Sequence, residues 1–248
     1  MVQRKYKNPP LVELICEFRL PSDSAWDLTM PGLIYEKVRN EFPDRKPHLL
    51  HHFEVASGQE GIGQKFRSEQ RVLFHATEDK RVFLEVGPRL LGVHSQVTPY
   101  PGWGHFRPKV DIGFDALTAV SNAKKLRGIT LYYVNRIEVP DEPDALGKYL
   151  NFRPLLADNG DMTYTSFIGG TRFTIGDDSC KVELQSAVPD VPENRAFLLV
   201  IDYSLAPDMT ILREDVPAWL ERAHEKVDEA FFEKCIKDPF RELIQEIK

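Results

Sequence analysis

Two pairs of polar residues have the types and spacing that could do chemistry. Glu13 and Glu17 lie four residues apart in NPPLVELICEFRL, and Asn135 and Arg136 are adjacent in ITLYYVNRIEV. Paired carboxylates can share general acid and general base roles, and an amide beside a guanidinium can line a ligand site. If the two segments are neighbours, these four residues form a ligand-binding or inter-repeat polar cluster. No nucleophile, glycine-rich loop or metal pattern accompanies them, so the sequence predicts no catalytic residue.

The same residues also have a structural interpretation, which we favour. Asn135 shares a strand face with apolar neighbours and must find hydrogen-bond partners, which the backbone of a loop can supply. Arg136 would then pair with Glu138 or, across strands, with Glu13. A charged ladder of this kind would hold the strands in register.

The histidines predict no metal site. His48, His51 and His52 lie close in sequence, but no acidic or cysteine ligand follows at matching spacing, so a surface loop or a helix N-terminus is expected. His224 in AHEKVD begins like a zinc-protease helix, yet Asp228 stands where that motif needs a second histidine. We expect His224 at a helix–sheet contact, with an i, i+4 bond to Asp228. No cofactor is predicted.

A loop dense in proline, glycine and aromatic residues is the favoured partner-binding segment. It is TPYPGWGHFRP, residues 98–108, and it carries Tyr100, Trp103, His105 and Phe106. Large side chains held on a stiff loop are typical anchors for a protein partner. The alternative is that Trp103 and Phe106 cap the core.

A basic series in the first half indicates a second class of partner. Residues 1–127 carry 19 Lys and Arg against 15 Asp and Glu, and residues 128–248 carry 13 against 23. Interleaved phenylalanines strengthen a nucleic-acid interpretation, and interleaved glutamates weaken it. The candidate basic face consists of Lys65, Arg67, Arg71 and Arg89. Its alternative is a solvated sheet face.

Hydrophobic periodicity divides the chain into strands and helices that occur twice in the same order. In the first half we expect a strand over residues 11–20, a helix from Thr29 to Phe42, strands at 61–68, 71–77, 81–87 and 90–96, and a helix at 111–126. In the second half we expect a strand over 129–139, a short helix at 144–150, strands at 164–169, 171–176, 180–188 and 197–205, and a long helix from 214.

This order predicts an α+β fold. Two β-α-β4-α repeats, residues 1–127 and 128–248, would join as one globular unit with a curved antiparallel sheet and helices on one face. The arrangement resembles that of TATA-box-binding proteins. The alternative is a single helix-grip-type curved sheet.

The amino-acid composition limits the class of protein and the cellular location that we expect. Of the 248 residues, 42% are hydrophobic and 28% charged, which is typical of a folded protein. No apolar run has the length of a membrane span, and the N-terminus lacks the apolar core of a signal peptide. Three widely spaced cysteines favour a reducing, cytoplasmic location.

Three segments together resemble a known family: NPPLVELICEFRL, YYVNRIEVP and AHEKVDEAFFEKCI. The family is an uncharacterised, sporadically distributed group of prokaryotic proteins of about this length. Its members have an N-terminal Asn/Pro-Pro-x-Val-Glu strand, a central Asn-Arg-Ile strand and a C-terminal Ala/Leu-His helix. The resemblance implies no established activity. Patchy distribution is typical of mobile or antiviral defence genes.

The sequence therefore favours a non-enzymatic binding or adaptor protein that acts through a protein partner or as a homodimer. The alternative is a nucleic-acid- or nucleotide-binding protein that uses the basic first half. An enzyme is the least supported class.

Overall fold

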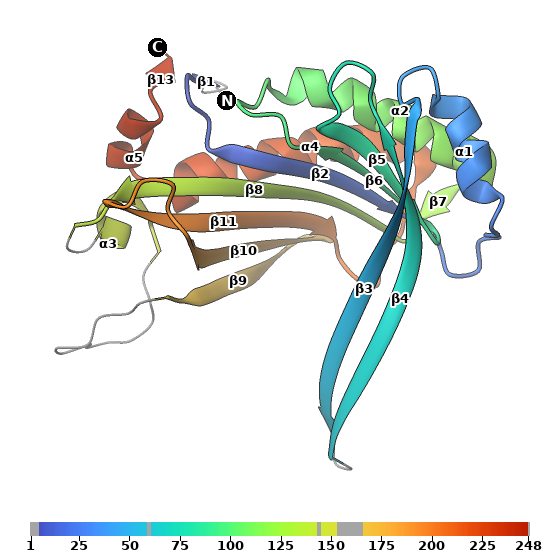
Figure 1. The fold of residues 1–248 in the computed structure, drawn as a ribbon, viewed down its shortest axis with the longest axis horizontal. Coiled ribbons are helices and arrows are strands. Elements are labelled where there is room, and N and C mark those ends of the chain that lie inside the picture. The colour runs from blue at the N-terminus through green and yellow to red at the C-terminus, as the bar shows by residue number, and fades with distance from the viewer. Residues whose placement is uncertain (1–4, 59–60, 143–144, 153–165, 248) are drawn as a thin grey trace.

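The computed structural model describes residues 5–58, 61–142, 145–152 and 166–247. Within these residues, nine strands form one antiparallel sheet in the order β3-β4-β5-β6-β2-β8-β11-β10-β9 (Figure 1). Their bounds are β2 Leu11–Arg19, β3 Asp44–Gly58, β4 Gly61–His75, β5 Val82–Gly87, β6 Leu90–Ser95, β8 Gly128–Pro140, β9 Ile168–Ile175, β10 Asp178–Ala187 and β11 Asn194–Leu205. The sheet is open, because it ends at β3 and at β9.

The two longest helices cover one face of this sheet. Helix α2, Trp103–Ser121, packs on β6, and helix α4, Val216–Glu229, packs on β8 and β11 (Figure 1). Helix α1, Met30–Val38, lies against α2 at one end of the molecule. We call the covered side the helix face and the opposite side the open face.

The smaller elements complete the described chain. They are β1 Lys5–Tyr6, β7 Lys125–Leu126, α3 Ala145–Tyr149, β12 Ile211–Leu212, the 3-10 turn Arg213–Asp215, the π-helix η2 Ala230–Cys235, α5 Asp238–Leu243 and β13 Glu246–Ile247. Strand β1 pairs with β13, so the two ends of the described chain meet. Not one helix in the described ranges has the length and apolar character needed to cross a membrane.

The central strands β2 and β8 pair antiparallel where the two halves of the chain join. A register shift between Leu11 and Glu13 places Leu11 among the buried residues and leaves Val12 half-buried. In the sequence, Val12, Leu14, Cys16 and Phe18 alternate with other residues, which predicts Val12 on the buried face. That prediction is wrong, because the bulge adds a residue to one strand. From Leu14 onward the expected alternation holds, with Leu14, Cys16 and Phe18 buried.

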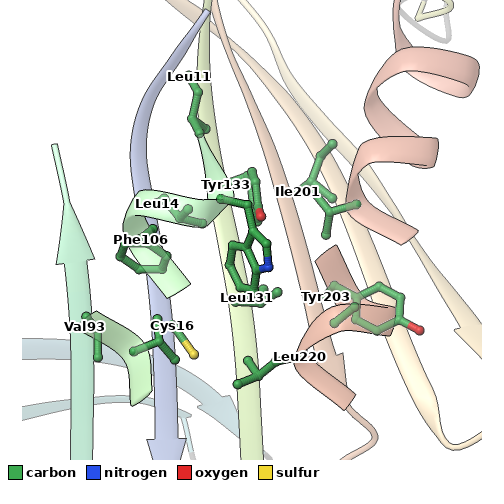
Figure 2. Close-up of a cluster of buried hydrophobic side chains, with 14 of the residues drawn as sticks. Leu11, Leu14, Cys16, Val93, Phe106, Leu131, Tyr133, Ile201, Tyr203 and Leu220 are labelled. Carbon is green, nitrogen blue, oxygen red and sulfur yellow. The ribbon is translucent and has the colours of Figure 1, made fainter. Parts of the chain in front are cut away.

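The core lies between the helix face and the two long helices. Figure 2 shows Leu14 and Cys16 of β2, Leu131 of β8, Phe106 of α2 and Leu220 of α4 gathered in one cluster. Burial of these apolar side chains is the main driving force for holding the helices on the sheet.

The α+β class is thus confirmed, with one large antiparallel sheet and few helices. After β2 and α1 the first half adds four strands and α2, as expected. After β8 and α3 the second half adds β9, β10 and β11 before α4, and residues 153–165 lie outside the described chain. The internal duplication stays a prediction.

Several predicted boundaries were wrong. Residues 61–75 form one strand, and His48, His51 and His52 lie in strand β3 instead of a surface loop or a helix N-terminus. Residues 168–175 form a single strand through Gly169 and Gly170. Helix α2 begins eight residues before its predicted start at Asp111 and contains Pro108. Its buried residues Trp103, Phe106 and Val110 outweigh the local preference of proline and glycine for a loop.

Candidate ligand-binding pocket

A cavity of about 460 Å³ opens between the start of α2, strand β8 and the end of α4. Four segments distant in sequence line it. They are the N-terminal residues Tyr6, Pro9, Pro10 and Leu11, the segment Tyr100 to His105, the β8 residues Tyr133 and Asn135, and a group from α4 and η2 made of His224, Val227, Asp228, Phe231 and Phe232.

The start of α2 is fixed over the pocket by contacts with α4. Gly102 has a φ of 104°, a conformation that glycine adopts without strain, and the helix begins at the next residue. Trp103 is 8% exposed, and its indole Nε1 donates a hydrogen bond of 3.0 Å to Glu221 Oε2. The Trp103 ring also stacks on the His224 imidazole, with ring centroids 4.5 Å apart.

Strand β8 forms the floor. Tyr133 and Asn135 both point to the helix face, and both are buried. The Asn135 side-chain amide donates to the backbone oxygen of Leu199 at 3.3 Å. The structural interpretation expected a partner in loop backbone, whereas Leu199 lies in the neighbouring strand β11. The Tyr133 hydroxyl lies 2.9 Å from Nδ1 of His224.

A short polar series crosses the pocket from β8 to α4. Burial raises the pKa of Tyr133 well above its ordinary value, so its hydroxyl stays neutral, and it shares a hydrogen bond of 2.9 Å with Nδ1 of His224. The other ring nitrogen of His224, Nε2, faces Asp228 Oδ2 at 3.6 Å. The predicted i, i+4 contact between His224 and Asp228 is therefore present, at a distance longer than a direct hydrogen bond.

Desolvation acts on the two ionisable groups in opposite directions. Burial lowers the pKa of His224 to about 4 and raises the pKa of Asp228 to about 7. Near neutral pH the imidazole is thus uncharged, and the carboxyl group is close to its titration midpoint. The Asp228 side chain is 34% exposed, and it lines the cavity.

The lining of the cavity is mostly aromatic. Six aromatic rings line the cavity: Tyr6, Tyr100, Trp103, Tyr133, Phe231 and Phe232. Among the lining residues that the structure describes there is no Ser, Thr, Cys or Lys. The pocket can enclose a compact organic group by aromatic contact and offer it one carboxyl group.

The predicted partner-binding segment is divided between pocket and core. Tyr100, Trp103 and His105 line the cavity, whereas Phe106 is 3% exposed and belongs to the core cluster. Burial of Trp103 and Phe106 agrees with the alternative in which these two residues cap the core. Tyr100 is half-buried, and its hydroxyl has no hydrogen-bond partner among the described residues.

The four residues of the expected polar cluster do not come together. Asn135 lines the pocket on the helix face, while Glu13, Glu17 and Arg136 lie on the open face. Glu17 pairs with Arg19 at 2.6 Å. Arg136 donates to the backbone oxygen of Val188 and to Asp190, and lies 3.6 Å from Glu138. The expected pairing with Glu138 is present.

Glu13 belongs to a different, charged network on the open face. The Gln96 amide donates to Glu13 Oε1 at 2.9 Å, and Nδ1 of His94 lies 3.7 Å from the same oxygen. On its other side, Nε2 of His94 lies 3.2 Å from Glu85, which pairs in turn with Arg71 at 3.2 Å. We call Glu13, His94, Glu85, Arg71 and Glu69 the open-face network.

The structure describes the side chains of two of the four residues that were predicted to form a basic face. Lys65 and Arg67 lie in β4, and their side chains are outside the described structure. Arg71 is 8% exposed and is neutralised by Glu69 and Glu85. Arg89 has a φ of 58° in the turn between β5 and β6, and its guanidinium donates to the backbone oxygen of Ser24. A nucleic-acid interface stays a prediction.

Metal ligands are not grouped in the part of the chain that the structure describes. There, no cluster of three or more His, Cys, Asp or Glu side chains is placed to hold a metal ion.

The pocket includes residues that sequence reasoning did not single out for function. Two of them are Tyr133 of β8 and Phe231 of η2. The sequence does contain one signal for the site, which is the presence of polar residues within the apolar stripe of a helix. His224 and Asp228 lie beside Ala223 and Val227, which are fully buried.

Comparison with known proteins leaves the pocket as the main guide to function. No model of a known protein family matches the chain, and no curated protein matches it.

Proposed function

We propose that this protein is a non-enzymatic binding protein that holds a compact organic group in the aromatic pocket. The observation that carries the proposal is the cavity of about 460 Å³, lined by six aromatic rings and closed at its floor by the Tyr133–His224 hydrogen bond. Concave, mostly apolar sites with a few convergent polar groups are the usual form of a ligand site.

The assembly of the pocket supports the proposal that the two halves act as one unit. Tyr100 to His105 come from residues 1–127, and Tyr133, His224 and Asp228 come from residues 128–248. Each half therefore supplies part of the lining. This is the role we propose for the predicted duplication, in which two repeats join around one sheet and place a site at their junction.

The proposal includes the adaptor function expected from the sequence. The segment predicted to contact a protein partner forms one wall of the cavity, so the bound group is either a free molecule or a side chain presented by a partner. All three cysteines are free, which fits the cytoplasmic location proposed for the chain. An accessory role in a mobile or defence-linked system remains part of this proposal.

Two glycine variants test whether the pocket binds. Gly104 lines the cavity near the start of α2, Gly32 lies near the start of α1, and an added Cβ at either position meets nothing within 4 Å. Gly104→Phe places a ring at the pocket, and Gly32→Phe is the matched control. Three probes of equal shape and different charge are titrated by NMR: choline, 3,3-dimethyl-1-butanol and 3,3-dimethylbutanoate.

The expected result is saturable binding of at least one probe to the wild type and to Gly32→Phe, with at least tenfold weaker binding to Gly104→Phe. Resonances of Tyr133 and His224 should shift on binding. Failure of all three probes to saturate the wild type would overturn the proposed function. Binding that shifts only resonances remote from the pocket would also overturn it.

A further inference from the structure

We infer that the group held in this pocket is an alkylated ammonium, the cation of a compact molecule or of a methylated lysine side chain. This inference rests on the proposed function and names its ligand class. It is carried by two features of the lining, the aromatic rings and a carboxyl group without a cationic partner.

The aromatic rings supply the first argument. The electron-rich faces of Trp and Tyr attract cations within about 6 Å, most strongly when water is excluded. One Trp and three Tyr rings line the cavity. Two stacked contacts hold the walls in place, because Trp103 lies on His224 at 4.5 Å and Tyr6 lies on Phe232 at 4.9 Å. The walls are therefore ordered before a ligand arrives, which lowers the entropy cost of binding.

The balance of charge supplies the second argument. Among the lining residues that the structure describes, Asp228 is the only Asp or Glu, and none is Lys or Arg. The groups that face Asp228 are His224 on its own helix, Tyr133 on β8 and Tyr100 before α2. Burial holds Tyr133 and Tyr100 neutral by raising their pKa values, and burial holds His224 neutral near pH 7 by lowering its pKa.

The Asp228 carboxylate thus lacks a counter-ion among the described residues. A bound cation would supply one, whereas an anion would be repelled and a neutral isostere would gain only apolar contact. A bulky alkylated ammonium suits the site better than a small metal ion, because it is weakly hydrated and can contact aromatic faces on several sides.

Binding should then be linked to a proton. A cation beside Asp228 favours its ionised form, so the ligand must displace the proton that occupies this group below a pKa of about 7. Affinity for choline should rise about tenfold between pH 6 and pH 8, following the ionised fraction of the carboxyl group. The uncharged isostere should show no such dependence.

The test is calorimetric titration of the full chain with choline and with 3,3-dimethyl-1-butanol at pH 6 and pH 8. Asp228→Asn keeps the shape of the side chain and removes its charge. Glu225→Gln makes the same change on α4 at an exposed position outside the lining, and serves as control. A peptide with trimethyllysine and its unmethylated counterpart distinguish a protein-borne ammonium from a free one.

We expect choline to bind at least tenfold more tightly than its isostere at pH 8, and Asp228→Asn to abolish both this preference and the pH dependence. Glu225→Gln should retain both. Equal binding of the isostere, or tighter binding of 3,3-dimethylbutanoate, would overturn the ammonium inference and leave the pocket a ligand site. Absence of all binding would overturn the proposed function itself.

Discussion

Two buried histidines lie on opposite faces of the same sheet and have opposite acid–base behaviour. His94, on the open face, is 9% exposed, and His224, on the helix face, is 8% exposed. Burial opposes the charge of both. At His94, contacts with Glu13 and Glu85 outweigh burial and raise the pKa, whereas burial prevails at His224 and lowers its pKa to about 4.

The difference shows that the charge of a buried side chain depends on the groups that contact it and not on its exposed fraction alone. His94 lies between two carboxylates whose own pKa values are lowered, and the network continues to Arg71. His224 lies between a neutral tyrosine hydroxyl and the face of an indole ring. One face of the sheet therefore carries a charged network, and the other carries an uncharged hydrogen bond beside an open cavity.

The largest expected effect concerns the end of the open-face network. Arg71→Met removes a guanidinium whose side chain is 10% exposed and leaves Glu69 and Glu85 without it. We expect the free energy of unfolding at pH 7 to fall by about 3–5 kcal/mol, measured by urea denaturation. Arg39→Met is the control, since Arg39 is 58% exposed in its pair with Glu36, and should cost less than about 1 kcal/mol. Equal effects would contradict the ionic network.

The second prediction compares the two histidines across pH. A raised pKa means that His94 stabilises the fold fully below the unfolded-state value of 6.5, and that this contribution is lost as pH rises through the folded value. A lowered pKa means that the contribution of neutral His224 is present above 6.5 and is lost as pH falls towards 4.

Stability curves of His94→Gln and His224→Gln against wild type should therefore diverge between pH 8 and pH 5. The loss caused by His94→Gln should grow as pH falls. The loss caused by His224→Gln should shrink by about 2 kcal/mol. Parallel curves from urea denaturation at each pH would show that the two sites do not differ in charge.

A third prediction compares a glycine beside His94 of the open-face network with a glycine at the pocket. A Cβ at Gly92 would lie 2.9 Å from Nε2 of His94, so Gly92→Ala must displace the ring from Glu85. We expect a loss of about 1–2 kcal/mol in thermal unfolding. At Gly104 an added Cβ meets nothing within 4 Å, and Gly104→Ala should stabilise the protein by about 0.5 kcal/mol. If Gly92→Ala leaves the stability of the protein unchanged, the His94 ring can move away from the added methyl group at no cost in free energy.

The smallest effect is expected at the pocket floor. Tyr133→Phe removes the hydroxyl that shares a hydrogen bond with Nδ1 of His224 and should cost about 1 kcal/mol. Tyr132→Phe, on the open face of the same strand, is the matched control and should lie within about 0.5 kcal/mol of wild type. If the two variants are equally stable, the Tyr133–His224 hydrogen bond contributes nothing measurable to the fold.

The sequence by itself determined the local alternation and the order of most elements. Leu14, Cys16 and Phe18 repeat with a period of two, and α4 shows a helical stripe, because each must bury one face. The same reasoning predicted a backbone partner for Asn135, the pairing of Arg136 with Glu138 and the contact of His224 with Asp228. All of these depend on neighbours within a few residues or on a requirement to satisfy a buried polar group.

Only the tertiary structure decided which distant segments meet. The bulge at Leu11 and the helical start at Trp103 both override local preference, because long-range packing outweighs what a few residues prefer. The pocket joins residues from both ends and the middle of the chain, so no spacing in the sequence could reveal it. The charge states of His94 and His224 are likewise set by partners that are distant along the chain, Glu13 for His94 and Tyr133 for His224.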